Sequence, residues 1–244
     1  LTSHFNIEGP LQKDKTSFIF GARSTYSKWM IQYLPQEYKK SSADYNDFNI
    51  GITHTINTNN TLYFNGYISG DQFRLNSDTN YRYQNKNFSL KYNHLFSNKF
   101  TSSYIIGYDE YGYNVASLLK DVNSFELSYK MQQEYIRLKY SYTLSSKQKF
   151  DFGASTQQYN LAPGSYLPNS PISNVKSTII NNEKALESAL YFTDNYSFNT
   201  KLKLDAGIRL NMYNYLGPQT IRNYNPNYPK EINLSLIHIS EPTR

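Results

Sequence analysis

Residues 201–216, KLKLDAGIRLNMYNYL, alternate between apolar and polar side chains with almost no exception. A period of two is typical of a β-strand, because successive side chains of an extended chain point to opposite faces. The run is also longer than the usual strand of about 5–6 residues. The chain must therefore place a long apolar strip either against a protein core or against lipid.

The same alternation recurs in pairs of segments along the chain. Polar turns of about two to four residues, such as NTNN and SNK, separate the members of each pair, and turns of this kind join antiparallel strands as hairpins. The predicted hairpins pair residues 47–56 with 61–73, 87–96 with 100–111, 134–144 with 149–161, and 185–198 with 201–216.

Longer connections, rich in Tyr, Asn, Ser and Pro, separate these hairpins. They cover residues 35–46, 74–86, 112–123 and 162–183. Alternating short and long connections are typical of outer-membrane barrels, which have short periplasmic turns and longer extracellular loops. We therefore expect an all-β fold, an antiparallel transmembrane β-barrel segment of about ten strands. A soluble or surface β-sandwich adhesin or binding protein is the alternative, because its strands would show the same period.

The composition agrees with membrane-spanning strands. The chain has 25 Tyr and 14 Phe among 244 residues, yet its mean hydropathy is −0.68. A spanning strand needs only about 9–11 residues with every second one apolar, so a barrel can be polar on average. The absence of cysteine excludes disulfides and thiolate metal sites. The net charge of +6 comes from scattered basic residues, so we expect no nucleic-acid partner.

Three segments carry a resemblance to a known family. They are GPLQKDKTSFIFGARSTYSKWMI (9–31), KFDFGASTQQYNLAPGS (149–165) and ALESALYFTDNYSFNTKLKLDAGIRLNMYNYLGP (185–218). The last is the most specific, with its Glu-x-Ala-x-Tyr, Asp-x-Tyr and Leu-x-Leu-x-x-Gly-x-Arg spacing. These segments resemble the barrel of TonB-dependent outer-membrane receptors, most closely the Bacteroidota type. The resemblance covers residues 1–233.

The resemblance implies a 22-strand barrel in the cell outer membrane, plugged by an N-terminal domain that this chain does not contain. Complete chains of the Bacteroidota type often also carry an N-terminal carboxypeptidase-regulatory-like domain. The expected partners are outer-membrane lipid, the TonB complex acting through the missing N-terminal region, and a small-molecule or oligomeric nutrient. A ferric siderophore is the favoured cargo, because members of the family commonly import such chelates. We expect no enzyme activity, no cofactor, and no transport by this internal fragment alone.

The last eleven residues, LSLIHISEPTR (234–244), break the strand pattern. They are identical to one reading frame of a transposase-type sequencing adaptor. We interpret them as a translated artefact without fold or function, so the barrel segment is expected to end at residue 233.

The alternation at 201–216 predicts which side chains face lipid and which face the barrel lumen. The charges there, together with Glu187 in the neighbouring segment, could form cross-strand ion pairs or contact a plug domain. The expected lipid-facing residues are Leu202, Leu204, Ile208 and Leu210, and the expected lumen-facing residues are Lys203, Asp205 and Arg209.

Tyrosines are the candidates for ligand binding, because Tyr supplies contact area at low entropic cost. Tyr-rich loops can equally pack against themselves above a barrel. The ligand candidates are Tyr81, Tyr83, Tyr111 and Tyr113, in the predicted loops at 74–86 and 109–123. An aromatic girdle is expected at the loop ends of the strands, formed by Tyr108, Tyr111, Tyr113, Tyr213 and Tyr215.

The histidines predict neither a metal site nor a catalytic site. His4, His54 and His94 fall in three separate predicted strands, without the spacing that zinc ligands need. His94 with a serine would suggest an outer-membrane hydrolase, but no Gly-x-Ser-x-Gly motif accompanies it. We expect the histidines to be structural.

Overall fold

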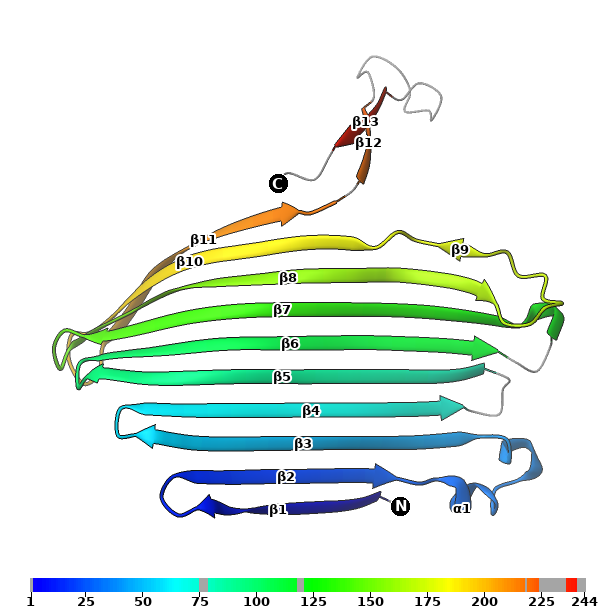
Figure 1. Cartoon of the computed structure of the whole chain (residues 1–244), viewed down its shortest axis with the longest axis horizontal. Helices are drawn as coiled ribbons and strands as arrows, with labels where there is room; N and C mark the ends of the chain where they lie inside the picture. Colours follow the sequence, from blue (N-terminus) through cyan, green and yellow to red (C-terminus); the bar gives the residue numbers. More distant parts are fainter. Residues whose placement is uncertain (1, 75–78, 118–120, 218, 224–235, 241–244) are drawn as a thin grey trace.

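One large antiparallel β-sheet dominates the computed structural model (Figure 1). The structure describes residues 2–74, 79–117, 121–217, 219–223 and 236–240. The sheet has eleven strands in the order β1-β2-β3-β4-β5-β6-β7-β8-β10-β11, with β9 paired to β8. Neighbours in the sequence are neighbours in space, and β1 and β11 lie at its two open edges.

The strands confirm the predicted hairpins and are unusually long. Strand β8 has 21 residues and strands β5 and β7 have 19 each. The strands of this sheet are β1 (Thr2–Gln12), β2 (Thr16–Thr25), β3 (Ser42–Asn57), β4 (Asn60–Arg74), β5 (Thr79–Ser97), β6 (Phe100–Ser117), β7 (Phe125–Thr143), β8 (Gln148–Pro168), β9 (Thr178–Ile179), β10 (Glu183–Ser197) and β11 (Lys203–Tyr215).

The predicted long connections were partly wrong. Residues 42–46, 79–86, 112–117 and 162–168 belong to strands β3, β5, β6 and β8, although their composition predicted loops. Only four residues separate β4 from β5. We keep the name long connections for 26–41, 75–78, 118–124 and 169–182, which join the strands at one end of the sheet. Tyr83, for example, pairs with Tyr113 across the β5–β6 ladder. In these segments both faces of the strand carry polar or aromatic residues, so the apolar alternation stops before the hydrogen-bonded ladder does.

Helices play a small part in the structure. A single turn α1 (Lys28–Ile31) and a 3-10 turn η1 (Gln36–Tyr38) lie between β2 and β3, and η2 (Asp121–Asn123) precedes β7. None of the helices in the described part of the chain is long and apolar enough to cross a membrane.

The sheet has almost no apolar core. Among the described residues, the only buried hydrophobic side chains are those of Tyr135, Ala185 and Ala189. Strand contacts run between neighbours within the sheet, and no second sheet packs on either face in the described ranges. A β-sandwich would bury the facing sides of two sheets, so the sandwich alternative is wrong for this chain.

A separate two-stranded sheet follows the large one. Strands β12 (Gln219–Asn223) and β13 (Leu236–Ser240) pair with each other and not with the large sheet. Strand β13 lies inside the segment 234–244. The interpretation of 234–244 as an adaptor artefact stays a prediction.

The apolar residues form a diagonal band across the strands. Register partners across antiparallel strands lie on the same face. One row of partners begins at the apolar Phe20 and Ile50 but reaches Glu134 and Gln158 on β7 and β8. The row that contains Leu210, Leu190 and Leu138 instead ends at His54 and Thr16 on β3 and β2. Strands therefore tilt relative to the band, as barrel strands tilt relative to a membrane.

Close strand packing makes one glycine a sensitive test of the fold. A Cβ atom at Gly153 would lie 2.0 Å from the backbone oxygen of Leu138, whereas a Cβ at Gly70 would have no heavy atom within 4 Å. We expect Gly153→Ala to lower the free energy of unfolding by about 1–3 kcal/mol, the usual cost of overpacking. Urea unfolding of the full-length receptor in detergent measures this, with Gly70→Ala as control. Equal stability of the two variants would contradict the close approach of β7 and β8 at Gly153.

Candidate functional site

The large sheet has two chemically distinct faces. We call apolar face the side that carries Phe20, Ile50, Leu90, Ile106 and their register partners, and polar face the opposite side. The apolar face is open: Ile106 is 51% exposed and Leu210 is 64% exposed. Soluble monomers rarely expose apolar patches this extensive, so the face requires a partner or a lipid environment.

The residues expected to face lipid and lumen separate between these faces. Strand β11 alternates, so its leucines and isoleucine lie on the apolar face and its charged residues on the polar face. Leu202 precedes the strand and is 56% exposed. Leu204, Ile208 and Leu210 thus share one face, and Lys203, Asp205 and Arg209 share the other.

The charges of this region do not pair with one another. Arg209 Nε donates to Asn211 Oδ1 at 2.8 Å, while Glu187 Oε2 accepts from Gln157 Nε2 at 2.8 Å and from Tyr159 Oη at 3.2 Å. No ion pair among the described residues joins Lys203, Asp205, Arg209 and Glu187 to each other. The charges are therefore open to a partner outside the sheet.

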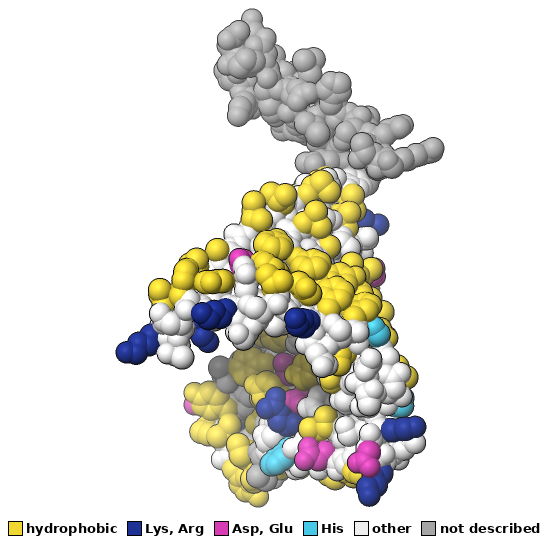
Figure 2. All heavy atoms as spheres, turned by 90° about the vertical axis from the view of Figure 1, so that its left-hand side faces the viewer, with side chains coloured by type: hydrophobic (Ala, Val, Ile, Leu, Met, Phe, Trp, Pro, Cys, Tyr) yellow, Lys and Arg dark blue, Asp and Glu magenta, His cyan; other side chains and the backbone are white. Residues whose placement is uncertain are grey.

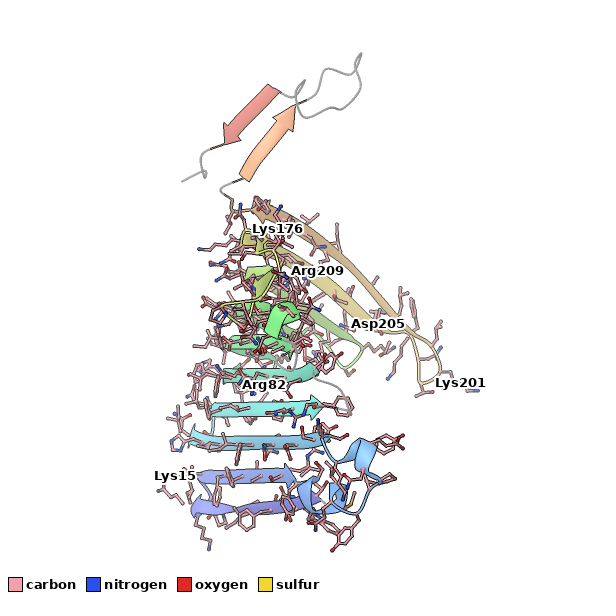
Figure 3. All side chains as sticks on the ribbon, turned by 90° about the vertical axis from the view of Figure 1, so that its right-hand side faces the viewer. Lys15, Arg82, Lys176, Lys201, Asp205 and Arg209 are labelled. Atoms are coloured by element: carbon pink, nitrogen blue, oxygen red, sulfur yellow. The ribbon has the colours of Figure 1, made fainter. Side chains whose placement is uncertain are left out.

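The polar face is concave where β5 to β11 curve. Figure 2 shows the sheet hollowed on one side, and Figure 3 shows the β10–β11 hairpin, which carries Asp205 and Arg209, bending away from the plane of the first strands. A cavity of about 520 Å³ on this face takes side chains from six strands. Curvature with the polar side inside is the arrangement of a barrel wall with a wet lumen.

Four cations line this cavity, which we call the basic cavity. Lys91, Arg137, Lys139 and Arg209 come from β5, β7 and β11, and Glu187 is the only carboxylate among the described residues of the lining. The guanidinium of Arg137 lies 4.3 Å from the centre of the Tyr135 ring, and Lys139 Nζ lies 3.7 Å from Asp151 Oδ1. The cations exceed the carboxylates, so the cavity attracts anions.

A cluster of tyrosines lies on the same face, nearer the long connections. The rings of Tyr113 and Tyr129 stack with centroids 5.2 Å apart and an interplanar angle of 15°. The ring centroids of Tyr83 and Tyr113 are 6.4 Å apart, and those of Tyr111 and Tyr129 are 6.2 Å apart. The ring centroids of Tyr81 and Phe73 are 6.5 Å apart. Flat aromatic surfaces and hydroxyl groups suit ligands that combine rings with polar groups.

The structure thus brings three of the four ligand candidates, Tyr83, Tyr111 and Tyr113, into one cluster, and places Tyr81 on the same face. They lie on strands rather than in loops. Tyr129 was missed, because only the β6–β7 register reveals that it lies opposite Tyr113. Of the cations of the basic cavity, Arg209 was expected to face the lumen. Lys91, Arg137 and Lys139 were missed, because only the register across the sheet brings them close to Arg209.

The expected aromatic girdle was largely misplaced. Of its five tyrosines only Tyr108 lies on the apolar face, because Tyr111, Tyr113, Tyr213 and Tyr215 have the opposite strand parity. An aromatic belt does occur on the apolar face, but at the short-turn ends of the strands. Its members include Tyr92, His94, Phe96, Phe100, Tyr104, Tyr140 and Phe152, in ring contacts of 4.2–6.1 Å.

His54 and His94 have structural surroundings. Nδ1 of His94 lies 2.5 Å from Asn60 Oδ1, and the His94 ring meets Phe96 edge-on. Nδ1 of His54 lies 2.8 Å from Thr16 Oγ1. Within the described ranges, no group of three or more His, Cys, Asp or Glu side chains has the arrangement of a metal site.

Comparison with known families gives a match over most of the chain. The family described as "TonB dependent receptor-like, beta-barrel" matches residues 26–230. No curated protein matches the chain.

Several solved structures share the fold at low sequence identity. The ferric enterobactin receptor PfeA of Pseudomonas aeruginosa, as a double mutant, has a TM-score of 0.65 and 13% identity over 87% of this chain. The ferripyoverdine receptor of the same organism, bound to ferripyoverdine, has a TM-score of 0.67 and 11% identity over 89%. BauA, the ferric preacinetobactin receptor of Acinetobacter baumannii, has a TM-score of 0.65 and 10% identity over 87%. The chain spans only 36%, 36% and 39% of these three proteins.

Proposed function

The chain belongs to the TonB-dependent receptor family, and on that basis we propose that it forms part of the barrel wall of an outer-membrane receptor that imports a scarce nutrient. Strands β1 to β8, β10 and β11 would cross the membrane with the apolar face toward lipid and the polar face toward the lumen. The short turns would then lie in the periplasm and the long connections outside. We further infer a Bacteroidota-type receptor whose barrel segment ends at residue 233.

One arrangement carries this proposal: the tyrosine cluster and the basic cavity occupy the same concave face at different depths. Tyr83 and Tyr129 lie nearer the long connections than Lys91 and Arg137 do, on the same two strands β5 and β7. A ligand that enters from outside would meet aromatic rings first and cations next. Lys91, Arg137 and Arg209 are each flanked in the sequence by two apolar or aromatic side chains of the apolar face, so the cations would lie at the depth of the diagonal apolar band.

This order of groups supports an anionic metal chelate as cargo. Ring systems of a chelator can stack on tyrosines, and its carboxylate or phenolate oxygens can accept hydrogen bonds from Arg and Lys. A ferric siderophore has this chemistry, which agrees with the ferric siderophore receptors among the structural neighbours. Uptake would draw energy from the TonB complex through an N-terminal region, and a plug domain would occupy the lumen. Transport, not enzymatic turnover, is the activity proposed.

Growth on defined media tests the proposal. We expect a strain that lacks the full-length gene to grow poorly when iron is supplied only as a siderophore chelate, and normally when cobalamin or a single glycan is limiting. A defect confined to glycan media would overturn the iron chelate while leaving a receptor in place. Normal growth on all three media would contradict the import function.

Complementation of the deletion strain tests whether the tyrosine cluster contacts the imported ligand. The full-length gene that carries Tyr113→Ala and Tyr129→Ala should restore growth incompletely, because both stacked rings are lost. Tyr142→Ala is the matched control, since Tyr142 lies on the apolar face and is 38% exposed. Equal rescue by both genes would remove the tyrosine cluster from the ligand path.

A further inference from the structure

A polar cluster lies on the apolar face, between the diagonal apolar band and the long connections. Lys86, Glu110, Gln132 and Asn160 are successive register partners across β5, β6, β7 and β8, and Lys130 is two residues from Gln132. Ile106 lies on the same face of β6, farther toward the short turns. We call these five residues the polar rim: Lys86, Glu110, Lys130, Gln132 and Asn160.

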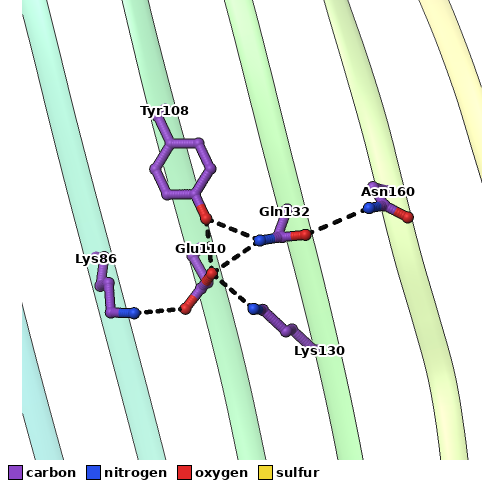
Figure 4. Close-up of polar contacts among 6 residues, drawn as sticks. All are labelled: Lys86, Tyr108, Glu110, Lys130, Gln132 and Asn160. Carbon is purple, nitrogen blue, oxygen red and sulfur yellow. Dashed lines mark hydrogen bonds and ion pairs between the residues drawn. The ribbon is translucent and has the colours of Figure 1, made fainter.

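One carboxylate organises the polar rim (Figure 4). Glu110 Oε1 contacts Lys86 Nζ at 2.8 Å, and Glu110 Oε2 contacts Lys130 Nζ at 2.9 Å. Tyr108 Oη donates to Oε2 at 2.6 Å and Gln132 Nε2 donates to it at 2.9 Å. Asn160 Nδ2 donates in turn to Gln132 Oε1 at 3.3 Å.

The rim presents cations to the outside and hides its anion. The Glu110 side chain is only 9% exposed, whereas those of Lys86 and Lys130 are 42% and 50% exposed. Each ammonium group has three N–H donors and uses one of them to bind Glu110. An anion that approaches along the apolar face therefore meets two fixed ammonium groups with unused donors.

Two cavities of different chemistry adjoin the rim on this face. An apolar groove of about 580 Å³ lies on its short-turn side and is lined by Phe64, Phe88, Leu90, Ile106, Tyr108 and Ile136 among others. A polar cavity of about 810 Å³ lies on its long-connection side. Its lining includes Asn80, Arg82, Glu110, Glu126 and Lys130, and Glu126 accepts a hydrogen bond from Asn114.

The polar cavity also holds an unused acceptor. Oδ1 of Asn80 is buried and has no hydrogen-bond partner. Buried polar atoms are normally satisfied, so an unpaired carbonyl oxygen beside a cavity indicates a site for a donor such as a hydroxyl group. The apolar groove, the two ammonium groups and this acceptor follow one another along the strands.

We propose that the polar rim binds the phosphate of a lipid headgroup in the outer leaflet, with an acyl chain of the same lipid in the apolar groove. The inference rests on the membrane placement proposed above, which sets the rim at the outer membrane–water boundary. Lysines at such a boundary extend toward headgroups and attract anionic lipids. Headgroup hydroxyls would reach the polar cavity and Asn80. The occupant is lipid rather than cargo, because the sheet itself separates the rim from the polar face.

Lipid retention by the full-length receptor tests the site. Receptor purified in mild detergent is mixed with bisphosphorylated lipid A or with its dephosphorylated form, and bound lipid is counted by native mass spectrometry. We expect wild type to prefer the phosphorylated form and the Lys86→Gln/Lys130→Gln variant to retain on the order of thirtyfold less of it, because two lysines near a membrane surface together contribute about 2 kcal/mol. Inorganic phosphate alone should not compete, because it lacks the acyl chain.

A matched variant controls for charge. Lys39→Gln/Lys40→Gln removes the same charge from exposed residues on the connection between β2 and β3, and should retain lipid A as wild type does. Equal losses in both variants, or equal binding of the dephosphorylated lipid, would overturn the site. Circular dichroism confirms that each variant is folded. Siderophore-dependent growth should persist in the Lys86→Gln/Lys130→Gln strain, so failure of the lipid site and failure of the import function give different results.

Discussion

Replacing Ile208 with arginine should lower the free energy of unfolding of the full-length barrel by about 2–4 kcal/mol, the cost of a lipid-facing cation near the bilayer midplane. Ile208 is 65% exposed on the apolar face, and its register partner on β10 is Phe192. An arginine there would either enter hydrocarbon or draw water and headgroups toward it. Urea unfolding of the receptor in lipid vesicles measures the difference.

An arginine on the opposite face of the same hairpin provides the control. Thr193 lies on the polar face, opposite Gly207 and Asp151 in the two neighbouring strands. We expect Thr193→Arg to change the unfolding free energy by less than about 1 kcal/mol, because a wet lumen solvates the charge. A cost at Thr193 equal to that at Ile208 would contradict the assignment of the two faces.

Removing the cations of the basic cavity should produce the largest loss of cargo affinity. We expect the triple variant Arg137→Gln, Lys139→Gln and Arg209→Gln to bind an anionic ferric chelate at least about a hundredfold more weakly, because hydrogen bonds to charged groups contribute about 1.5–3 kcal/mol each. Fluorescence titration of the full-length receptor with a tricatecholate iron chelate measures the dissociation constant.

A second triple variant separates local from general effects of charge. Lys147→Gln, Lys149→Gln and Lys201→Gln removes the same charge near the short turns, outside the cavity lining. Its affinity for the chelate should stay close to that of wild type. If both variants lose affinity equally, the basic cavity is not a specific site, and if neither does, the cargo binds elsewhere or is not anionic.

The sequence was sufficient for the hairpins and for the two faces of β11. Both depend on local information, since a period of two and a short polar turn are properties of neighbouring residues. Leu204 and Arg209 were assigned to opposite faces from alternation alone, and the β10–β11 register agrees. Alternation alone did not distinguish a barrel wall from a sandwich, because both have a period of two. The strand length and the alternation of short and long connections favoured the barrel wall.

The extent of the strands and the composition of the site required the structure. Tyr83 and Tyr113 were placed in loops because their segments are polar on both faces, yet backbone pairing continues through them. The basic cavity depends on register across six strands and on sheet curvature, neither of which is local. The polar rim was not predicted from the sequence. Lys86 and Glu110 are far apart in the sequence, and only the β5–β6 register places them side by side on the apolar face.

The environment of successive residues on β11 tests the membrane placement most directly. Spin labels are placed singly at residues 204, 205, 208, 209 and 210 of the full-length receptor in lipid bilayers, and their accessibility to oxygen and to a water-soluble nickel complex is measured. We predict alternation: labels at 204, 208 and 210 are accessible to oxygen as in lipid, and labels at 205 and 209 are not. Uniform accessibility along the strand would contradict a membrane-spanning barrel wall.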